Sequence, residues 1–116
     1  MKPCILLLAA AAAALLTGCR STPPPMPLAE LDPQQLAGHA SYQAHCAMCH
    51  YDRESGQLNG PSMLGVFKRT SLPSGAAATD ERVSSTILHG RNNMPAIGNQ
   101  LADGDLQDIL AYLHTL

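Results

Sequence analysis

The sequence predicts a small all-α domain of about three to five helices joined by long loops. The C-terminal stretch "ADGDLQDILAYLHTL" repeats apolar residues at i, i+3, i+4 and i+7, the spacing of one helix face. Two earlier stretches carry helix start and stop signals, and no stretch alternates as a half-buried strand would. The chain has 116 residues, with one Phe and no Trp, so a core built from its own side chains would be thin.

The first helix is expected to run from Asp32 toward Cys46, because Asp32 suits the cap and Pro33 the first helical position. Gly38 lies inside this helix, at a cost of about 1 kcal/mol relative to Ala. Gly38, Tyr42 and Cys46 are spaced by four and share one face. A glycine on a buried face indicates that another helix crosses closely there.

Two further helices follow a loop. Residues 52–75 are rich in Gly, Pro, Ser and Asn and are expected to be loop, with room for a short helical turn. "TDERVSSTILHG" predicts a helix that Thr79 caps and Gly90 ends. In the last helix Asp103 is expected to cap, and Gly104 weakens the first turn. Loops of this length need a surface on which to pack.

The start of the chain resembles an export signal. "MKPCILLLAAAAAALLTGC" has one Lys, an apolar run too short to span a bilayer of roughly 30 Å, and then small residues. Its end, "LTGC", resembles a bacterial lipobox, which implies that residues 1–18 are removed and that Cys19 carries lipid. Ordinary secretion with an incidental Cys19 is the alternative. By the same resemblance, Arg20 after the lipid site favours the outer membrane over the inner one.

Residues 19–32 are expected to form a tether, and residues 33–116 the folded domain. Four prolines between Arg20 and Leu31 predict an extended, semi-rigid chain of about 3.1 Å per residue. The predicted location is therefore the bacterial cell envelope, facing the periplasm, with a lipid anchor in a membrane.

The stretch "AHCAMCHYD" brings together Cys46, Cys49 and His50, and three kinds of site use such a pattern. A redox dithiol is expected beside a βαβ pattern, which is missing from the sequence. Structural zinc needs four ligands, and no cysteine follows Cys49. Cys-x-x-Cys-His is the signature of c-type haem attachment, which takes place in exported chains. Haem is the favoured interpretation, with zinc and the dithiol as alternatives.

The pattern resembles the class I, single-haem cytochrome c family over nearly all of residues 33–116. "GHASYQAHCAMCH" resembles that family's first helix, "NGPSMLGVFKR" its Gly-Pro loop and "MPAIG" the loop with the distal methionine. Ile109 and Tyr112 match the last helix, which crosses the first at the small residue. The resemblance implies an all-α domain around one haem c, bound covalently through Cys46 and Cys49.

The resemblance also implies the residues around the iron. His50 would be the proximal ligand and Met94 the distal one. The Pro61 carbonyl, next to Gly60, would accept a hydrogen bond from the His50 ring, as metal-bound histidines require. Arg69 would help to neutralise a haem propionate, or else it is a solvated charge.

Other residues compete for the distal position. Met26 lies in the tether, Met48 in the attachment turn and Met63 in the Gly-Pro loop, on the proximal side by resemblance. His89 is the second candidate for the distal ligand. The other histidines, His39, His45 and His114, are expected at or near the surface.

Two filled axial positions imply a one-electron carrier and not an enzyme. It would exchange electrons with redox proteins such as a respiratory complex, a dehydrogenase, an oxidase or a reductase. The alternatives are a haem-bearing subunit of a larger dehydrogenase or oxidase complex, and a peroxidase-like enzyme or sensor if Met94 does not bind. Removal of the signal peptide would also remove Lys2, leaving six basic and nine acidic residues. This balance argues against a strongly basic docking surface. No basic run supports nucleic-acid binding.

Overall fold

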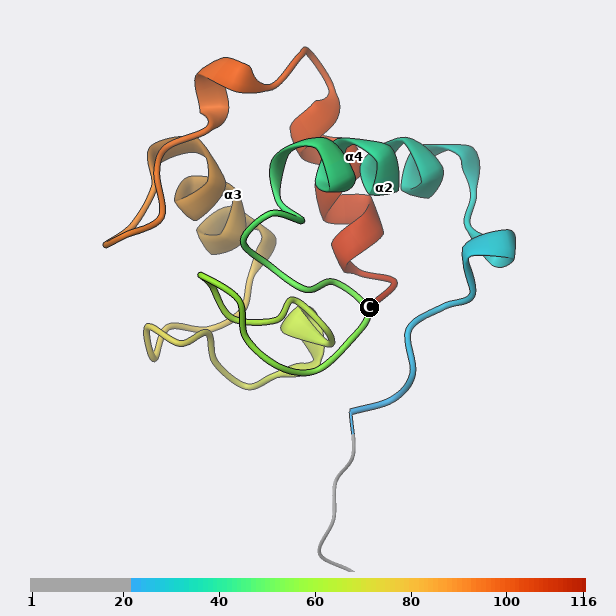
Figure 1. Ribbon diagram of the computed structural model, residues 1–116, viewed down its shortest axis with the longest axis horizontal. Helices are drawn as coiled ribbons and strands as arrows, with labels where there is room; N and C mark the ends of the chain where they lie inside the picture. Colours follow the sequence, from blue (N-terminus) through green and yellow to red (C-terminus); the bar gives the residue numbers. More distant parts are fainter. Residues whose placement is uncertain (1–21) are drawn as a thin grey trace, which may run out of the picture.

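The structure is a computed structural model, and it describes residues 22–116. The expected signal peptide and the lipid-bearing Cys19 lie outside these residues. Figure 1 shows the arrangement of the helical elements, which are η2 (Leu28–Glu30), α2 (Pro33–His45), η3 (Val66–Lys68), α3 (Asp80–His89), η4 (Gly98–Gln100) and α4 (Asp105–Leu113). Over the described residues, extended pairing is limited to two isolated bridges, so the predicted all-α class is confirmed. None of the helices in this part is both long and apolar enough to cross a membrane.

Helix α2 begins as predicted. The Asp32 side chain accepts a hydrogen bond from the Gln35 backbone N–H at 2.8 Å, and the Gln35 side chain accepts one from the Asp32 N–H at 2.9 Å. This reciprocal pair satisfies two of the backbone donors that a helix start leaves free. Pro33, in the first turn, has no N–H that needs a partner.

Helices α2 and α4 cross (Figure 1), and Gly38 of α2 lies in close contact with α4. A Cβ atom added at Gly38 would overlap the backbone carbonyl of Asp108 and crowd the Cβ of Tyr112. Any side chain at this position would therefore push the two helices apart. The expected reason for a glycine inside the first helix is confirmed.

Helix α3 also has the predicted ends. The Thr79 hydroxyl accepts a hydrogen bond from the Arg82 N–H, and Gly90 ends the helix with a φ of 74°. Asp80 and Glu81 lie in the first turn, where the positive end of the helix dipole favours carboxylates.

The expected cap of the last helix was wrong. Gly104 adopts a φ of 94°, which turns the chain between Asp103 and the helix, so α4 begins only at Asp105. The Asp105 carboxylate then accepts a hydrogen bond from the Ala102 N–H at 2.8 Å, and it also accepts one from the Ser41 hydroxyl at 3.1 Å. The last helix is therefore secured to α2 through Asp105.

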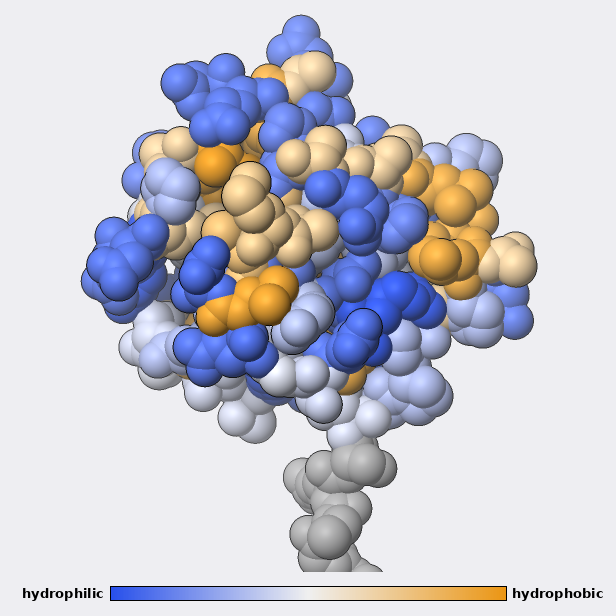
Figure 2. All heavy atoms as spheres, in the orientation of Figure 1, coloured by the Kyte–Doolittle hydropathy of each residue, from blue (hydrophilic) through white to orange (hydrophobic). Residues whose placement is uncertain are grey.

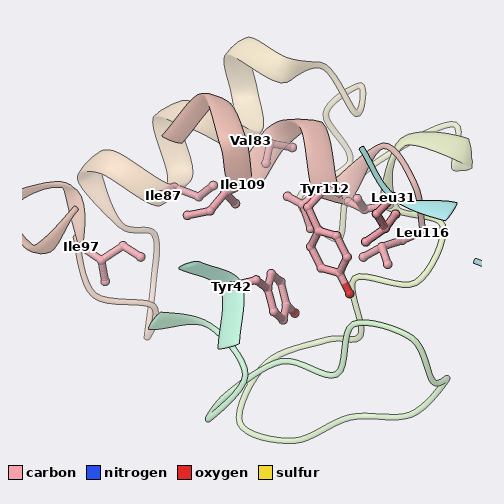
Figure 3. Close-up of a cluster of buried hydrophobic side chains, with 10 residues drawn as sticks. Leu31, Tyr42, Val83, Ile87, Ile97, Ile109, Tyr112 and Leu116 are labelled. Carbon is pink, nitrogen blue, oxygen red and sulfur yellow. The ribbon is translucent and has the colours of Figure 1, made fainter. Parts of the chain in front are cut away.

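The core lies where α2, α3 and α4 meet (Figure 3). Its largest fully buried side chains are Tyr42, Ile109, Tyr112 and Leu116. The rings of Tyr42 and Tyr112 lie edge to face with centroids 5.7 Å apart, a favoured aromatic geometry. Leu31 is also buried in this cluster, so the packed part of the chain extends N-terminal of Pro33. An apolar patch over η2 and the start of α2 stays exposed and includes Leu28 and Leu36 (Figure 2).

Candidate functional site

A cavity of about 560 Å³ opens beside the core. Its walls come from the end of α2, the loop between α2 and α3, one face of α3, the turn after α3, and α4. Apolar side chains that line it include Val66, Val83, Ile87, Ile109 and Leu113. Seven of the sequence-predicted site residues line this same cavity: Cys46, Cys49, His50, Gly60, Pro61, Arg69 and Met94.

One backbone turn presents both cysteines and the histidine. Cys46 is the C-cap residue of α2. Its carbonyl accepts hydrogen bonds from the backbone N–H of Cys49 at 3.0 Å and from that of His50 at 2.9 Å. Both thiols are free. Burial, together with the neighbouring Cys49, raises the pKa of the Cys46 thiol to about 11, so it remains protonated at neutral pH. Two thiols and one imidazole are thus held together at one edge of the cavity.

The tautomer of His50 follows from its hydrogen bond. The ring Nδ1 lies 2.7 Å from the Pro61 carbonyl oxygen. Because a carbonyl only accepts, Nδ1 carries the proton and donates it, which leaves the lone pair of Nε2 available for a metal. Gly60 allows this approach, since a Cβ atom there would overlap the His50 ring. The expected partnership of His50 with the Gly-Pro loop is present in the structure.

Tyr42 holds the backbone that follows the histidine. Its hydroxyl lies 3.0 Å from the carbonyl oxygen of His50 and 3.3 Å from that of Tyr51, and it donates to them. Tyr112 acts in the same region, donating to the Asp52 carboxylate at 2.6 Å. The crossing of α2 and α4 is therefore linked to the segment that positions His50.

The buried phenol groups of Tyr42 and Tyr112 should make the stability of the fold depend on pH in the alkaline range. Burial is the main cause that raises the pKa of Tyr42 and of Tyr112 above their ordinary value, because the phenolate is poorly solvated in the core. A raised pKa in the folded state means that stability is complete below about pH 10, the unfolded value, and falls as the pH rises above it. In an alkaline absorbance titration, two of the three tyrosines should ionise only together with unfolding. Ionisation of all three before any loss of helical circular dichroism would contradict this prediction.

Met94 is held by a tight turn after α3. The backbone N–H of Arg91 donates to the Met94 carbonyl, and the Met94 N–H donates to the Arg91 carbonyl, both at 2.9 Å. Asn92 inside the turn has a φ of 51°, a left-handed conformation that Asn tolerates better than most residues. Gly90 is required beside it, because a Cβ there would collide with the backbone of Met94. The thioether therefore reaches the cavity from a well-defined backbone.

Of the other residues considered for the distal ligand, only Met63 lines the cavity. Met48 is 82% exposed, and Met26 lies outside the cavity lining. His89 is exposed on α3, with its Nδ1 3.1 Å from the Ser85 carbonyl oxygen, and it does not line the cavity. Met63 does line it, two residues after the carbonyl that binds His50. A ligand opposite His50 must come from another wall, and the Met94 turn provides one.

Arg69 braces the Gly-Pro loop as well as lining the cavity. Its guanidinium donates to the carbonyls of Ser62 at 3.0 Å and Leu64 at 2.8 Å. Arg91, which the sequence analysis did not single out, is the other charged residue of the lining. Two cations and no carboxylate at a cavity with apolar walls suit a flat apolar ligand that carries acidic groups.

These residues fit the porphyrin that the sequence predicts. The cavity supplies two thiols at one edge, an imidazole with a free Nε2, a thioether from a separate wall, and two cations. In residues 22–116 no three His, Cys, Asp or Glu side chains group as a zinc site requires. Sequence reasoning missed Asn59, whose amide lies 3.8 Å from the Cys49 sulfur, and Leu72 of the lining. Nothing in their spacing marks either residue before the loop is folded.

Comparisons with known proteins agree with this geometry. The family model described as cytochrome c oxidase, cbb3-type, subunit III matches residues 33–113. Cytochrome c6 from Picosynechococcus sp. is 28% identical over 80 residues, which cover 66% of this chain and 68% of the relative. Cytochrome c6 from Thermosynechococcus vestitus is 29% identical over 91 residues, with coverage of 74% and 78%. The solved structure of cytochrome c6 from the diatom Phaeodactylum tricornutum has a TM-score of 0.54 and 25% identity, covering 68% of this chain and 88% of that one.

Proposed function

The chain belongs to the cytochrome c family, and on that premise we propose that it is a one-electron carrier with one covalent haem c. The observation that supports this most is the shared cavity. One turn brings Cys46, Cys49 and His50 to it, and a separate turn brings Met94. When bound, haem c supplies a one-electron iron couple.

Different side chains would attach the haem, bind its iron and set its reduction potential. Cys46 and Cys49 would form the two thioether links, and His50 would bind iron through Nε2. The Pro61 carbonyl keeps His50 in the required tautomer and orientation through the 2.7 Å hydrogen bond. Met94 would supply the second iron ligand from a separate wall of the cavity. A thioether is a soft ligand and favours the ferrous state, which raises the reduction potential relative to a second histidine.

The apolar walls of the cavity would surround much of the bound haem. Apolar side chains from α3 and α4 line the cavity, and their low polarizability disfavours the extra positive charge of the ferric state. Because hydrogen bonds hold both the His50 ring and the Met94 turn, the same two side chains would hold the haem in both oxidation states. Little protein rearrangement then accompanies electron transfer, which suits a carrier better than an enzyme.

The ferric absorption spectrum of the purified holoprotein tests this proposal. A low-spin spectrum with a thioether-to-iron charge-transfer band is expected, together with a reversible one-electron titration. A high-spin, five-coordinate spectrum would instead indicate an open position and support a peroxidase-like enzyme or a sensor.

The proposed location is the periplasmic side of a bacterial membrane, with lipid on Cys19 as the anchor. Support comes from the "LTGC" sequence, which ends a signal-like segment. Two or three acyl chains anchor strongly, since each buried CH₂ contributes about 0.8 kcal/mol. Replacing Cys19 with Ser should release a soluble, still red protein into the periplasm. Fractionation of cells checks this, and continued membrane retention of Cys19→Ser would contradict the anchor.

The donor and acceptor are proposed to be redox proteins of a respiratory chain, such as a dehydrogenase and an oxidase. The description of the matching family model names an oxidase subunit, which favours one second candidate, a haem-bearing subunit of a larger complex. Gentle purification from native membranes distinguishes the two. A stoichiometric partner would support the subunit, and a protein that elutes alone and exchanges electrons with membrane extracts would support the free carrier.

A further inference from the structure

The Pro-rich segment before α2 does not behave as the free tether that its composition predicts. The backbone N–H of Met26 donates to the Thr115 carbonyl at 2.8 Å, and the Arg53 guanidinium donates to the Met26 carbonyl at 2.7 Å. Thr22 packs on Gly65, because a Cβ atom added to Gly65 would overlap the Thr22 methyl group. Leu31 is 7% exposed and belongs to the core. The segment is therefore held at both ends and in the middle.

The sequence of this segment suits docking. Four of the five residues from 23 to 27 are prolines and have no backbone N–H. Met26 carries the one N–H available there, and that N–H is bonded to the folded domain. Proline also restricts the unfolded chain, so ordering the segment costs less conformational entropy than ordering a flexible linker.

Docking shortens the distance between the anchor residue and the domain. A free tether from Cys19 to Asp32 would extend about 40 Å as a polyproline chain. With Thr22 seated on Gly65, only two residues separate Cys19 from Thr22, and the three Cα-to-Cα steps between them span at most about 11 Å. The part of the domain beside Gly65 then lies next to the anchor. In Figure 1 the described chain starts beneath the green-to-yellow loop that contains Gly65.

The charges of this loop fit a phospholipid surface. Residues 55–79 contain no Asp or Glu, although the chain has nine of them, and they include the exposed Lys68 and Arg69. The exposed Glu54 and Asp80, at the start of α3, are the carboxylates at the two ends of this loop, and Asp80 lies 2.7 Å from the Nε2 of His114. His114 in turn stacks on Phe67, with ring centroids 3.9 Å apart. The loop thus offers the exposed Lys68 to anionic headgroups, beside an Arg69 whose guanidinium also binds the Ser62 and Leu64 carbonyls.

We propose that residues 22–31 form a docked strap, which seats the 55–79 loop against the phospholipid surface that holds the lipid of Cys19. The strap fixes the orientation of the cavity relative to the membrane, where a free tether would let the domain rotate. The docking depends on contacts within the described chain alone. The membrane contact rests on the proposed lipid anchor.

Fluorescence quenching tests the docking without any lipid. The mature haem-loaded chain, exported with an ordinary signal peptide, keeps Cys19 as a thiol that can carry a fluorophore, which the haem quenches at short distance. A single short lifetime is expected. Met26→Pro removes the N–H bond to Thr115 in a segment already rich in proline, and Arg53→Gln removes the other hydrogen bond. Each should lengthen the mean lifetime about twofold or more and broaden its distribution, as the reach grows toward about 40 Å.

Pro24→Ala is the matched control, because Pro24 is exposed, and its lifetime should equal that of the wild type. Unchanged circular dichroism and Soret absorption establish that each variant is folded. A broad, long-lifetime distribution in the wild type, the same as in both variants, would overturn the strap.

The membrane contact is tested with the lipidated holoprotein in phosphatidylglycerol vesicles that carry spin-labelled headgroups. Backbone NMR signals of residues 65–69 should be lost, while those of the first turn of α2 persist. Uniform broadening, or loss centred on α2, would overturn the proposed membrane face. If instead Cys19→Ser protein stays on membranes, the anchor itself is wrong, and the quenching result for the strap still holds.

Discussion

Replacing Met94 with Ala is expected to abolish the thioether-to-iron charge-transfer band and to lower the reduction potential. The drop should be roughly 0.1 V or more, on the scale of about 0.8 V over which axial ligands set haem potentials. The physical reason is the loss of a soft ligand that favours ferrous iron. The turn itself should survive, because the Arg91–Met94 hydrogen bonds involve backbone atoms only. Absorption spectra and a potentiometric titration of the purified variant check the prediction.

Two other methionines serve as controls for this substitution. Met48 is 82% exposed, so Met48→Ala should change neither the band nor the potential. Met63 lines the same cavity, in the loop that holds the His50 ring, and Met63→Ala should retain the band. Loss of the band in Met63→Ala, with its retention in Met94→Ala, would assign the distal ligand to Met63.

Replacing Gly38 with Ala should destabilise the fold although Ala is the better helix former. A Cβ at this position overlaps the backbone carbonyl of Asp108, which cannot move away as a flexible side chain can. We expect the free energy of unfolding to fall by about 3 kcal/mol, the upper end of typical overpacking penalties. That loss is a large fraction of the 5–15 kcal/mol that is typical for a domain. Urea unfolding of the holoprotein, followed by circular dichroism, measures it.

Ala40→Gly is the matched control, because Ala40 is exposed on the same helix. It should cost only about 1 kcal/mol, the difference in helix propensity. An increase in stability for Gly38→Ala would show that the two helices can separate without penalty and would contradict the close crossing.

Local signals predicted the helices well because their causes are local. Asp32, Thr79 and Gly90 cap or end helices through contacts within a few residues, and the structure confirms each of them. The Asp103 cap failed because Gly104 adopts a left-handed conformation that the spacing does not reveal. Family resemblance assigned Arg69 to a charged group of the cofactor, and the structure adds its bonds to the Ser62 and Leu64 carbonyls. Those bonds join parts of a loop whose course depends on tertiary packing.

By itself the sequence determined the all-α class, the haem-attachment pattern of Cys46, Cys49 and His50, and the family resemblance. These follow from short-range spacing, which the chain carries whether or not it is folded. Only the tertiary structure decided that Met94 and His50 line one cavity, that His50 keeps Nε2 free, and that the Pro-rich segment lies against the domain. The bond from Met26 to Thr115 joins the beginning of the described chain to its end. No local pattern encodes such a contact, because it forms only when α2 and α4 cross and bring both ends of the domain together.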